Sequence, residues 1–545
     1  MIKGKFSVWN LVVTLIVGFV MYFFFLPPLN VTSMQFWTFI MTLLFIFIFL
    51  NTFNVVEIIR KKRFDYVIIK RILLILFAIP MLIILVNFIL SPIFNSKAFS
   101  QRISVVEDTE ESNFITEVSE VNFDSLPLLD KDSSRRLGDR VMGQMPELVS
   151  QFYVSNLYTQ INYNNEIIRV TPLEYNGFFK YISNYKDGVK GYITVNSVDG
   201  EANLVKLDEG MKYMPSAYLF KDLDRHLRFS YPTKIFGESN FEIDNEGNPY
   251  WITPTLKYTG IELREDVSGV IITDAITGKS KYYDASDIPS WVDHVYSANL
   301  IISMVNDWGK YRDGFFNSIF GQKNVVATTD GYNYMVMEDD VYLYTGITSV
   351  SSDESNLGFI LTNLRTKDTR FYSVPGAEEY SAMASATGQV QQMRYTSTFP
   401  LLINLNNRPT YLVSLKDDAG LVKMYGFIDV NDYQKVVVTD SSKGIEVAAN
   451  NYLNNVEFDI DSSLLEERTI NIKNVNTAII DGNTYYYFVS DDNKKYYVSI
   501  NVDSKNLPFV KVGDNLKIKI YNEKDVTEII EIMGWYFILF FFWII

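Results

Sequence analysis

Gly269-Val-Ile-Ile-Thr-Asp-Ala-Ile-Thr-Gly-Lys-Ser-Lys-Tyr-Tyr-Asp284 decides the fold, because it recurs without a gap as Gly358-Phe-Ile-Leu-Thr-Asn-Leu-Arg-Thr-Lys-Asp-Thr-Arg-Phe-Tyr-Ser373. In both stretches an apolar run leads to a turn, and a second run ends in a basic residue followed by two aromatic residues. This pattern is typical of a β-hairpin, and its recurrence predicts a repeated unit. A third, weaker copy covers residues 406–428, with its turn at Lys416-Asp-Asp-Ala-Gly420.

Helices are predicted between these hairpins, with apolar residues spaced three or four positions apart. Asp132 or Ser133 can cap the first of them. Each predicted helix is followed by segments rich in Tyr, Phe, Val, Ile and Thr, so the repeat unit is one helix on a small antiparallel meander. This predicts an α+β fold. The predicted helices cover residues 133–143, 216–229, 291–311 and 376–393.

The turn Asp274-Ala-Ile-Thr-Gly-Lys279 resembles the D/N-x-x-T-G-K turn of PepSY-like and cystatin-like folds, in which a helix packs on a meander. The resemblance covers residues 133–438 in three or four copies. The chain as a whole resembles membrane-anchored proteins of Gram-positive bacteria that have a multi-span N-terminus before such an exported region. The resemblance implies binding at the cell surface rather than chemistry.

Three apolar runs precede the repeats, at residues 8–26, 36–50 and 72–94. Spanning about 30 Å of hydrocarbon takes about 20 apolar residues, so residues 1–95 are predicted to form three transmembrane helices. None of the three runs contains Asp, Glu, Lys, Arg or His. Since intramembrane charge marks transport paths, we expect an anchor. The alternative is a buried helical hairpin in a soluble protein.

Basic residues predict the orientation of this anchor. Lys3 and Lys5 precede the first run, and residues 60–71 between the second and third runs are rich in Lys and Arg. Basic loops stay in the cytoplasm. We therefore expect a cytoplasmic N-terminus, a retained first helix rather than a cleaved signal peptide, and an extracytoplasmic location after about residue 95.

The composition excludes several classes of function. The 545 residues carry a formal net charge of −15, which argues against nucleic-acid binding because that relies on Lys and Arg. Cysteine is absent, so disulfides, thiolate nucleophiles and Cys-ligated metals are excluded. An exported region without cysteine fits a Gram-positive envelope. The sequence assigns no cofactor and no metal.

The rest of the chain is predicted to contain four further kinds of segment. Residues 96–131, with the acidic stretch Val106-Glu-Asp-Thr-Glu-Glu-Ser112, are expected to be a solvated stalk. Residues 132–290 and 291–440 hold the α+β repeats. Residues 441–530 are predicted to form a small OB-like β-barrel, from strands at 469–480, 484–490, 495–502 and 515–521 and the barrel-like stretch Phe509-Val-Lys-Val-Gly-Asp514.

The last segment, residues 531–545, is an apolar tail. Its thirteen final residues, Met533 to Ile545, make a helix of about 20 Å, too short to cross a bilayer. We expect the tail to dip into the outer leaflet or to pack on the anchor. A buried core strand and a non-native terminus are the alternatives.

Candidate catalytic residues are few. The only histidines are His226 and His294, and the pairs Asp222/His226 and Ser290/His294 are spaced four apart, as on one face of a helix. No Gly-x-Ser-x-Gly motif accompanies them, so core or capping roles are expected. Ser183-Asn-Tyr-Lys186 matches Ser-x-x-Lys but lacks the motifs that support it.

Acidic groups are a second source of candidates. They occur at Asp244/Glu246, Glu338/Asp339/Asp340 and Asp353/Glu354, each in a predicted turn. A carboxylate pair for hydrolysis and a calcium site are both conceivable there. The sequence names no catalytic, cofactor-binding or metal-binding residue.

The expected function is a membrane-anchored extracytoplasmic binding or assembly scaffold protein of the cell envelope, without enzymatic activity. Its expected partners are the membrane and a protein or envelope polymer on the outer face, and not nucleic acid. The alternatives are an envelope-polymer hydrolase with a carboxylate pair and a subunit of a membrane signalling or secretion complex.

Overall fold

The structure is a computed structural model that falls into two units, Met1–Val456 and Glu457–Ile545. Each unit is described by itself. The residues that the structure describes are 8–52, 66–123, 126–337, 340–350, 352–456, 465–480, 483–520 and 525–536.

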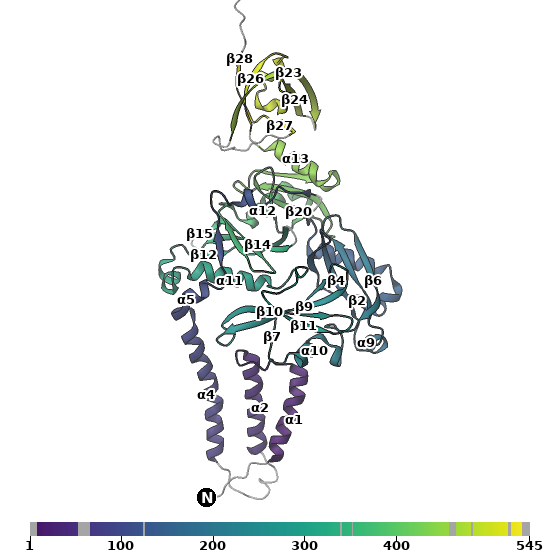
Figure 1. Ribbon diagram of the computed structural model, residues 1–545, viewed down its shortest axis with the longest axis vertical. Coiled ribbons are helices and arrows are strands. Elements are labelled where there is room, and N and C mark those ends of the chain that lie inside the picture. The colour runs from purple at the N-terminus through teal and green to yellow at the C-terminus, as the bar shows by residue number, and fades with distance from the viewer. Residues whose placement is uncertain are drawn as a thin grey trace, which may run out of the picture. The chain divides into compact units, whose positions relative to one another are not determined.

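Apolar helices begin the first unit: α1 (Val8–Phe25), α2 (Met34–Thr52) and α4 (Tyr66–Leu90). Figure 1 shows them side by side at one end of this unit. Among the described residues, no single helix has both the length and the apolarity to cross a membrane. The bent pair Leu74–Leu90 and Pro92–Ser100, with a bend of 57°, meets that condition by length and composition.

A repeated arrangement of one helix and one antiparallel sheet follows, and it occurs four times in the described part of the first unit. In each repeat the helix leads to two short strands, which both pair with the next, longer strand. Two further strands extend the sheet. The first repeat consists of α7 (Lys131–Gly143), β2 (Phe152–Val154), β3 (Thr159–Tyr163), β4 (Glu166–Tyr175), β5 (Val189–Asn196) and β6 (Ala202–Met211).

The second repeat has the same order of elements, with two short strands on β9. Its apolar residues share one core with the first repeat, centred on residues such as Trp251, Ile193 and Leu227. It consists of α10 (Leu223–Ser230), β7 (Ile235–Phe236), β8 (Asn240–Ile243), β9 (Pro249–Thr259), β10 (Arg264–Asp274) and β11 (Ser280–Asp284).

The third and fourth repeats are built in the same way. The third consists of α11 (Ala298–Tyr311), β12 (Val326–Thr328), β13 (Asn333–Met337), β14 (Asp340–Ser349), β15 (Ser352–Asn363) and β16 (Thr369–Tyr372). The fourth consists of α12 (Glu379–Gln389), β18 (Thr396–Ser397), β19 (Leu401–Asn404), β20 (Pro409–Lys416), β21 (Val422–Asp429) and β22 (Val436–Asp440), and α13 (Ile445–Asn455) follows it. The α+β fold class is confirmed.

The two hairpins that align in the sequence have the same register. Ile271 faces Tyr282, and Ile360 faces Phe371 at the matching position. Their turns also use the same bonds. The Asp274 carboxylate accepts hydrogen bonds from the N–H groups two and three residues on, at 2.8 and 3.0 Å, and the Asn363 amide oxygen does so at 2.8 and 3.0 Å.

Another hairpin with this turn lies in the first repeat, where the sequence analysis did not find it. The Asn196 amide oxygen accepts from the N–H groups of Val198 (2.8 Å) and Asp199 (3.4 Å). Gly200 has φ +80°, as Gly278 has φ +76°, so both glycines take the left-handed conformation that closes the turn. The signal was present as Asn-x-x-Asp-Gly, without the threonine and lysine of the later copies.

The third predicted hairpin, β20–β21, is confirmed with a different turn. Asp417 N–H donates to the carbonyl of Leu421, so this turn closes over four positions instead of five, and a β-bulge follows Leu415. This difference explains why the sequence match was weaker there.

The predicted helices are confirmed in part. α7 and α12 match 133–143 and the middle of 376–393, whereas 216–229 divides into a short 3-10 turn, η2 (Leu219–Lys221), and α10. The prediction of a helix from residue 291 was wrong at its start. α11 begins at Ala298, with Ser297 as its cap. The backbone N–H groups of Asp293 and His294 are instead bound by the Glu242 carboxylate.

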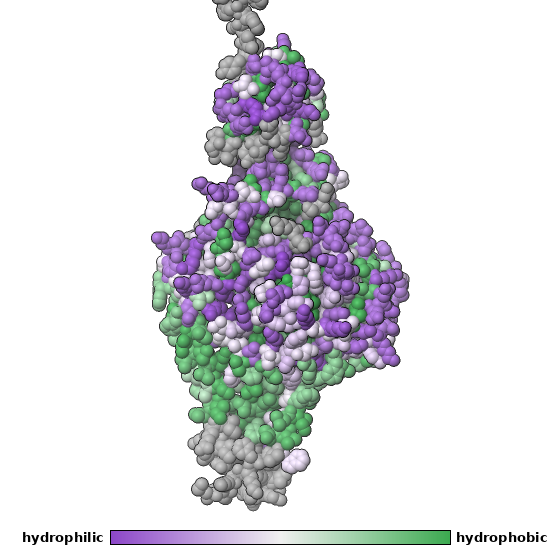
Figure 2. All heavy atoms as spheres, viewed as in Figure 1, coloured by the Kyte–Doolittle hydropathy of each residue, from purple (hydrophilic) through white to green (hydrophobic). Residues whose placement is uncertain are grey.

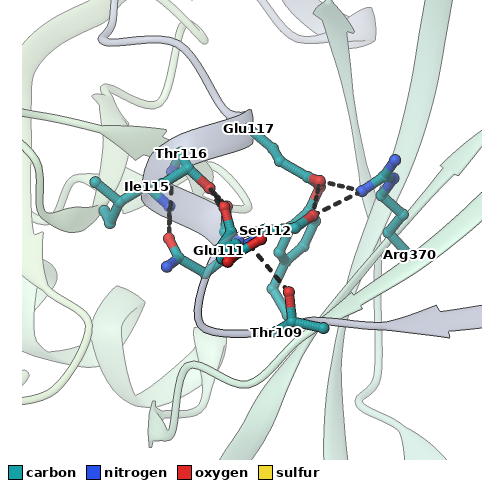
Figure 3. Close-up of polar contacts among 9 residues, drawn as sticks. Thr109, Glu111, Ser112, Ile115, Thr116, Glu117 and Arg370 are labelled. Atoms are coloured by element: carbon teal, nitrogen blue, oxygen red, sulfur yellow. Dashed lines mark hydrogen bonds and ion pairs between the residues drawn. The ribbon is translucent and has the colours of Figure 1, made fainter.

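The expected stalk at 96–131 was also wrong, because this segment packs on the third and fourth repeats. β1 (Val105–Glu107) pairs in parallel with β16, and α6 (Phe114–Glu117) places Phe114 in a buried core. Several of its acidic residues have partners, for example Glu107 with Arg312 and Asp108 with the Ser373 N–H. The Glu117 carboxylate binds Arg370 and Ser112 and accepts from the Tyr372 hydroxyl at 2.6 Å, and Figure 3 shows Arg370 pointing toward it.

The second unit contains a curled six-stranded sheet, in the order β27-β25-β24-β23-β26-β28. Alternate aromatic residues of β24 lie in its core, including Phe488. The expectation that the tail from 531 is membrane-associated was wrong for its first residues, because β28 pairs with β26; residues 537–545 lie outside the described residues. The strands of this sheet are β23 (Glu466–Ile480), β24 (Asn483–Ser490), β25 (Lys495–Ser499), β26 (Asn515–Ile520), β27 (Val526–Glu528) and β28 (Glu531–Tyr536).

The packing of α6 leads to a test on stability. Phe114 is 1% exposed, so Phe114→Ala should lower the free energy of unfolding by about 3–5 kcal/mol. The matched control Phe316→Ala, at a side chain 65% exposed, should change it by about 0.5 kcal/mol or less. Urea denaturation of the detergent-solubilised protein measures both. Equal, small effects would mean that the segment is a free stalk.

Candidate functional site

A cleft of about 1410 Å³ lies in the first unit, and we call it the central cleft. All four repeats contribute to its walls, for example through Gln160, Pro254, Tyr334 and Leu412. The ends of α1 and α2 complete it, with Phe25 of α1 among the lining residues. A concave site shared by several structural repeats is where a ligand is expected to bind.

The end of α1 is held by two arginines of α10. Arg225 Nε donates to the carbonyl of Phe23 at 3.1 Å, and Arg228 Nε donates to the carbonyl of Leu26 at 2.9 Å. The last carbonyls of a helix have no partner within the helix and carry partial negative charge, so guanidinium groups stabilise them. Burial lowers the pKa of Arg228 to about 10.

The other two helices are held by the loop between β9 and β10. The Glu262 carboxylate accepts from the Met34 N–H at 2.8 Å, where the first turn of α2 has unpaired N–H groups. The Asn87 side chain of α4 makes two bonds of 2.9 Å with the backbone of Ile261. All three apolar helices are therefore fixed to the second repeat.

Arg169 of β4 lines the central cleft without a compensating charge. Arg169 is only 7% exposed, and its guanidinium group forms no ion pair with the described residues. Its Nη2 donates to the carbonyl of Leu129 over a long 3.4 Å, while its Nε has no partner. Burial lowers the pKa of Arg169 to about 10, so it is still charged at neutral pH. A buried unpaired charge is costly, by several kcal/mol.

Asp130 is the carboxylate that acts electrostatically on Arg169, and it already has other partners. It binds the Lys416 ammonium and accepts from the Ser133 N–H at 2.9 Å, which caps α7. Burial opposes its ionisation, but these hydrogen bonds lower the pKa of Asp130 below its usual value. Two buried cations thus share one carboxylate, which leaves a positive charge at this wall of the cleft.

Gln160 and Tyr158 are two further residues of the cleft wall with unpaired polar groups. Gln160 faces Arg169 across the β3–β4 ladder, where opposite residues have Cβ atoms about 5 Å apart. Gln160 is 2% exposed and its Nε2 has no partner; the Tyr158 hydroxyl, also buried, has none either. Both line the central cleft. Together with Arg169 Nε, these are three buried donors of cleft-lining residues that protein atoms do not satisfy.

His294 has a structural position in the same wall. Its Nε2 lies 2.6 Å from the carbonyl of Gln160, so the proton is on Nε2, and burial lowers the pKa of His294 to about 4. The Glu242 carboxylate accepts from the N–H groups of Asp293 (2.9 Å) and His294 (3.0 Å). Burial raises the pKa of Glu242 to about 8. This network fastens the linker before α11 to the first two repeats.

The other predicted candidates are not brought together. His226 Nε2 lies 2.8 Å from the carbonyl of Gly278 and 3.4 Å from the Ser280 hydroxyl, and the His226 ring contacts Tyr213. His226 therefore joins α10 to the turn and the following strand of the second-repeat hairpin. The spacing of Ser290 and His294 had suggested a shared helical face, but neither lies in a helix. The Ser183 hydroxyl donates to the carbonyl of Phe179 within its own helix.

Of the acidic candidates, Asp244 and Asp340 have structural partners. Asp244 accepts from the N–H groups of Glu246 and Asn248 in its turn, and Glu246 lines a second cleft of about 670 Å³. Asp340 pairs with Arg365. Glu338 and Asp339, and the side chains of Asp353 and Glu354, lie outside the described residues. In the described part of the chain, no three His, Asp or Glu side chains are grouped as metal ligands.

Exposed apolar side chains surround the ends of the helices, and sequence reasoning missed them. We call them the apolar collar: Phe178, Phe179 and Ile182 of α9 (Phe178–Asn184), Leu219 and Phe220 of η2, and Phe316, Ile319 and Phe320 beside η3 (Asn317–Gly321). The Phe220 ring packs on Phe23 of α1, with centroids 5.7 Å apart. Figure 2 shows hydrophobic residues gathered at this end of the first unit.

The pKa of His294 leads to a second test. In the unfolded chain a histidine takes up a proton near pH 6.5, and the folded protein does so only near pH 4. The contribution of neutral His294 to stability should therefore be present above pH 6.5 and be lost as the pH falls toward 4, by about 2–3 kcal/mol.

His294→Gln keeps a donor to Gln160 but cannot titrate. Urea denaturation between pH 4 and pH 8 should give a smaller loss of stability in acid for this variant than for the wild-type protein. The two should differ little at pH 8. If the free energy of unfolding depends on pH in the same way in both proteins, the assignment of this acid-dependent loss to His294 is wrong.

No protein-family model matches this chain, and no curated protein sequence matches it.

Proposed function

We propose that this protein is a membrane-anchored, extracytoplasmic binding or assembly protein of the cell envelope. Its N-terminus lies in the cytoplasm and residues after about 95 lie outside. The observation that carries the proposal is the fixing of the ends of α1, α2 and α4 to one repeat, through Arg225, Arg228, Glu262 and Asn87. The anchor and the exported region then act as one body rather than as a tethered domain.

The charge distribution supports this orientation. The segment between α2 and α4 is rich in Lys and Arg, whereas residues 26–34 between α1 and α2 carry no charge. Cationic loops stay on the cytoplasmic side. The apolar collar lies on elements next to the other ends of the helices, where aromatic side chains are favourable at a lipid interface.

Binding rather than catalysis is proposed as the activity. The central cleft has unsatisfied donors, and the nearer hydrogen-bond partner of each histidine is a backbone carbonyl, at 2.8 Å for His226 and 2.6 Å for His294; the Ser280 hydroxyl is farther from His226, at 3.4 Å. We propose in addition that the repeats are PepSY-like or cystatin-like modules and that the second unit is an OB-like barrel. The whole chain would then resemble membrane-anchored surface proteins of Gram-positive bacteria. The partner is a protein or an envelope polymer.

The topology can be tested by cysteine labelling, because the chain has no native cysteine. Asp418→Cys, on an exposed turn of the fourth repeat, should react with a membrane-impermeant maleimide in intact cells. Lys61→Cys, in the basic segment, should react only after permeabilisation. The opposite pattern would overturn the orientation, and labelling of both in intact cells would overturn the anchor.

The apolar collar gives a separate prediction. Phe179 is 81% exposed, so an environment-sensitive fluorophore on Phe179→Cys should be quenched by bromine-labelled lipids after reconstitution in vesicles. The same fluorophore on Asp418→Cys should not be quenched. Equal quenching at the two positions, or none at Phe179→Cys, would place the collar away from lipid.

A further inference from the structure

We propose that the central cleft binds the phosphate headgroup of an anionic lipid, with Arg169 as its ion partner and the apolar chains leaving past the end of α1. This inference rests on the proposed membrane location and names the class of ligand. It begins with the charge of Arg169, which the described residues leave unpaired. Arginine in such a position matches phosphate oxygens with two parallel donors.

Neighbouring groups favour an acceptor-rich ligand. Arg169 Nε, Gln160 Nε2 and the Tyr158 hydroxyl have no hydrogen-bond partner, and all three residues line the cleft. Buried donors are nearly always satisfied in folded proteins. A phosphate has only acceptor oxygens when fully ionised, so it satisfies several donors at once.

The acids of the cleft do not compete for Arg169. Asp130 is bound by Lys416, Asp224 interacts electrostatically with Arg225 and Arg228, and Glu265 accepts from the Tyr258 hydroxyl at 3.3 Å. Glu238, the remaining acid of the cleft, is exposed to solvent. The cationic wall therefore has room for one more negative charge.

The other end of the cleft is apolar and adjoins the helices. Phe24 and Phe25 of α1 and the following Leu26 line it together with Leu223 and Leu256, next to the polar side chains of Gln35, Asp224 and Arg228. The first two side chains are also exposed. A ligand that reaches Arg169 from this side places its polar group against Arg169 and its apolar part against α1. A lipid whose headgroup enters the cleft while its acyl chains stay near the helices would be arranged in this way. The volume of about 1410 Å³ exceeds the usual range of about 300–1,000 Å³ for small-ligand sites.

The test uses the full-length protein in an uncharged detergent and isothermal titration calorimetry. The probes are dihexanoyl phosphatidylglycerol, dihexanoyl phosphatidylcholine and inorganic phosphate. We expect phosphatidylglycerol to bind at least tenfold more tightly than the other two. Equal binding of inorganic phosphate would assign the site to a soluble phosphate compound and overturn the lipid; no binding of any probe would overturn the anion site.

Variants separate recognition from folding. Arg169→Gln should weaken phosphatidylglycerol at least tenfold, whereas Arg140→Gln, at an exposed arginine of α7, should leave it unchanged. Without ligand, Arg169→Met should have a thermal midpoint equal to or above that of the wild-type protein, because it removes an unpaired buried charge. A clear fall in that midpoint would mean that Arg169 has a structural partner, and would overturn the proposal. The cysteine-labelling experiment described above reports the membrane topology whether or not a lipid binds, so a failure of the proposed function can be distinguished from a failure of this inference.

Discussion

The turn that closes each hairpin is the constraint on which the repeats depend. A side-chain oxygen of Asp274, Asn363 or Asn196 accepts two backbone N–H groups and fixes where the chain reverses. Because side chains alternate between the two faces of a strand, a shift of one residue would turn the core residues of the sheet outward. The register of three sheets is therefore determined locally, and each sheet can then bury one face under its helix.

Local patterns of this kind were predictable from the sequence, and contacts between distant segments were not. The turns at 274–279 and 363–368 share residue types at fixed spacing, so the hairpins and the α+β class followed directly. The turn at 196–201 keeps only the Asn and the Gly of that pattern, and it was missed. The segment before the helix at 298 is held at Asp293 and His294 by Glu242, about fifty residues earlier in the chain, which no local pattern reports.

The site illustrates the same limit. Arg169 in a strand would ordinarily point to solvent, and nothing in Glu166–Tyr175 indicates that three other repeats close over it. The acidic stretch at 106–112 was interpreted as solvated because the partners of Glu107 and Asp108, which are Arg312 and the Ser373 N–H, are far away in the sequence. A cluster of acidic residues in the sequence does not show whether basic residues from distant parts of the chain pair with it in the fold.

The parallel pairing of β1 with β16 has a consequence for biosynthesis. The Ser373 N–H that binds Asp108 is 265 residues further along the chain, so β1 has to wait while the first two repeats are made. At about 5–20 residues per second, this delay is roughly 13–50 s. During that time the segment after the apolar helices has an open strand edge, and the nascent chain would need protection from mispairing until the third repeat is made.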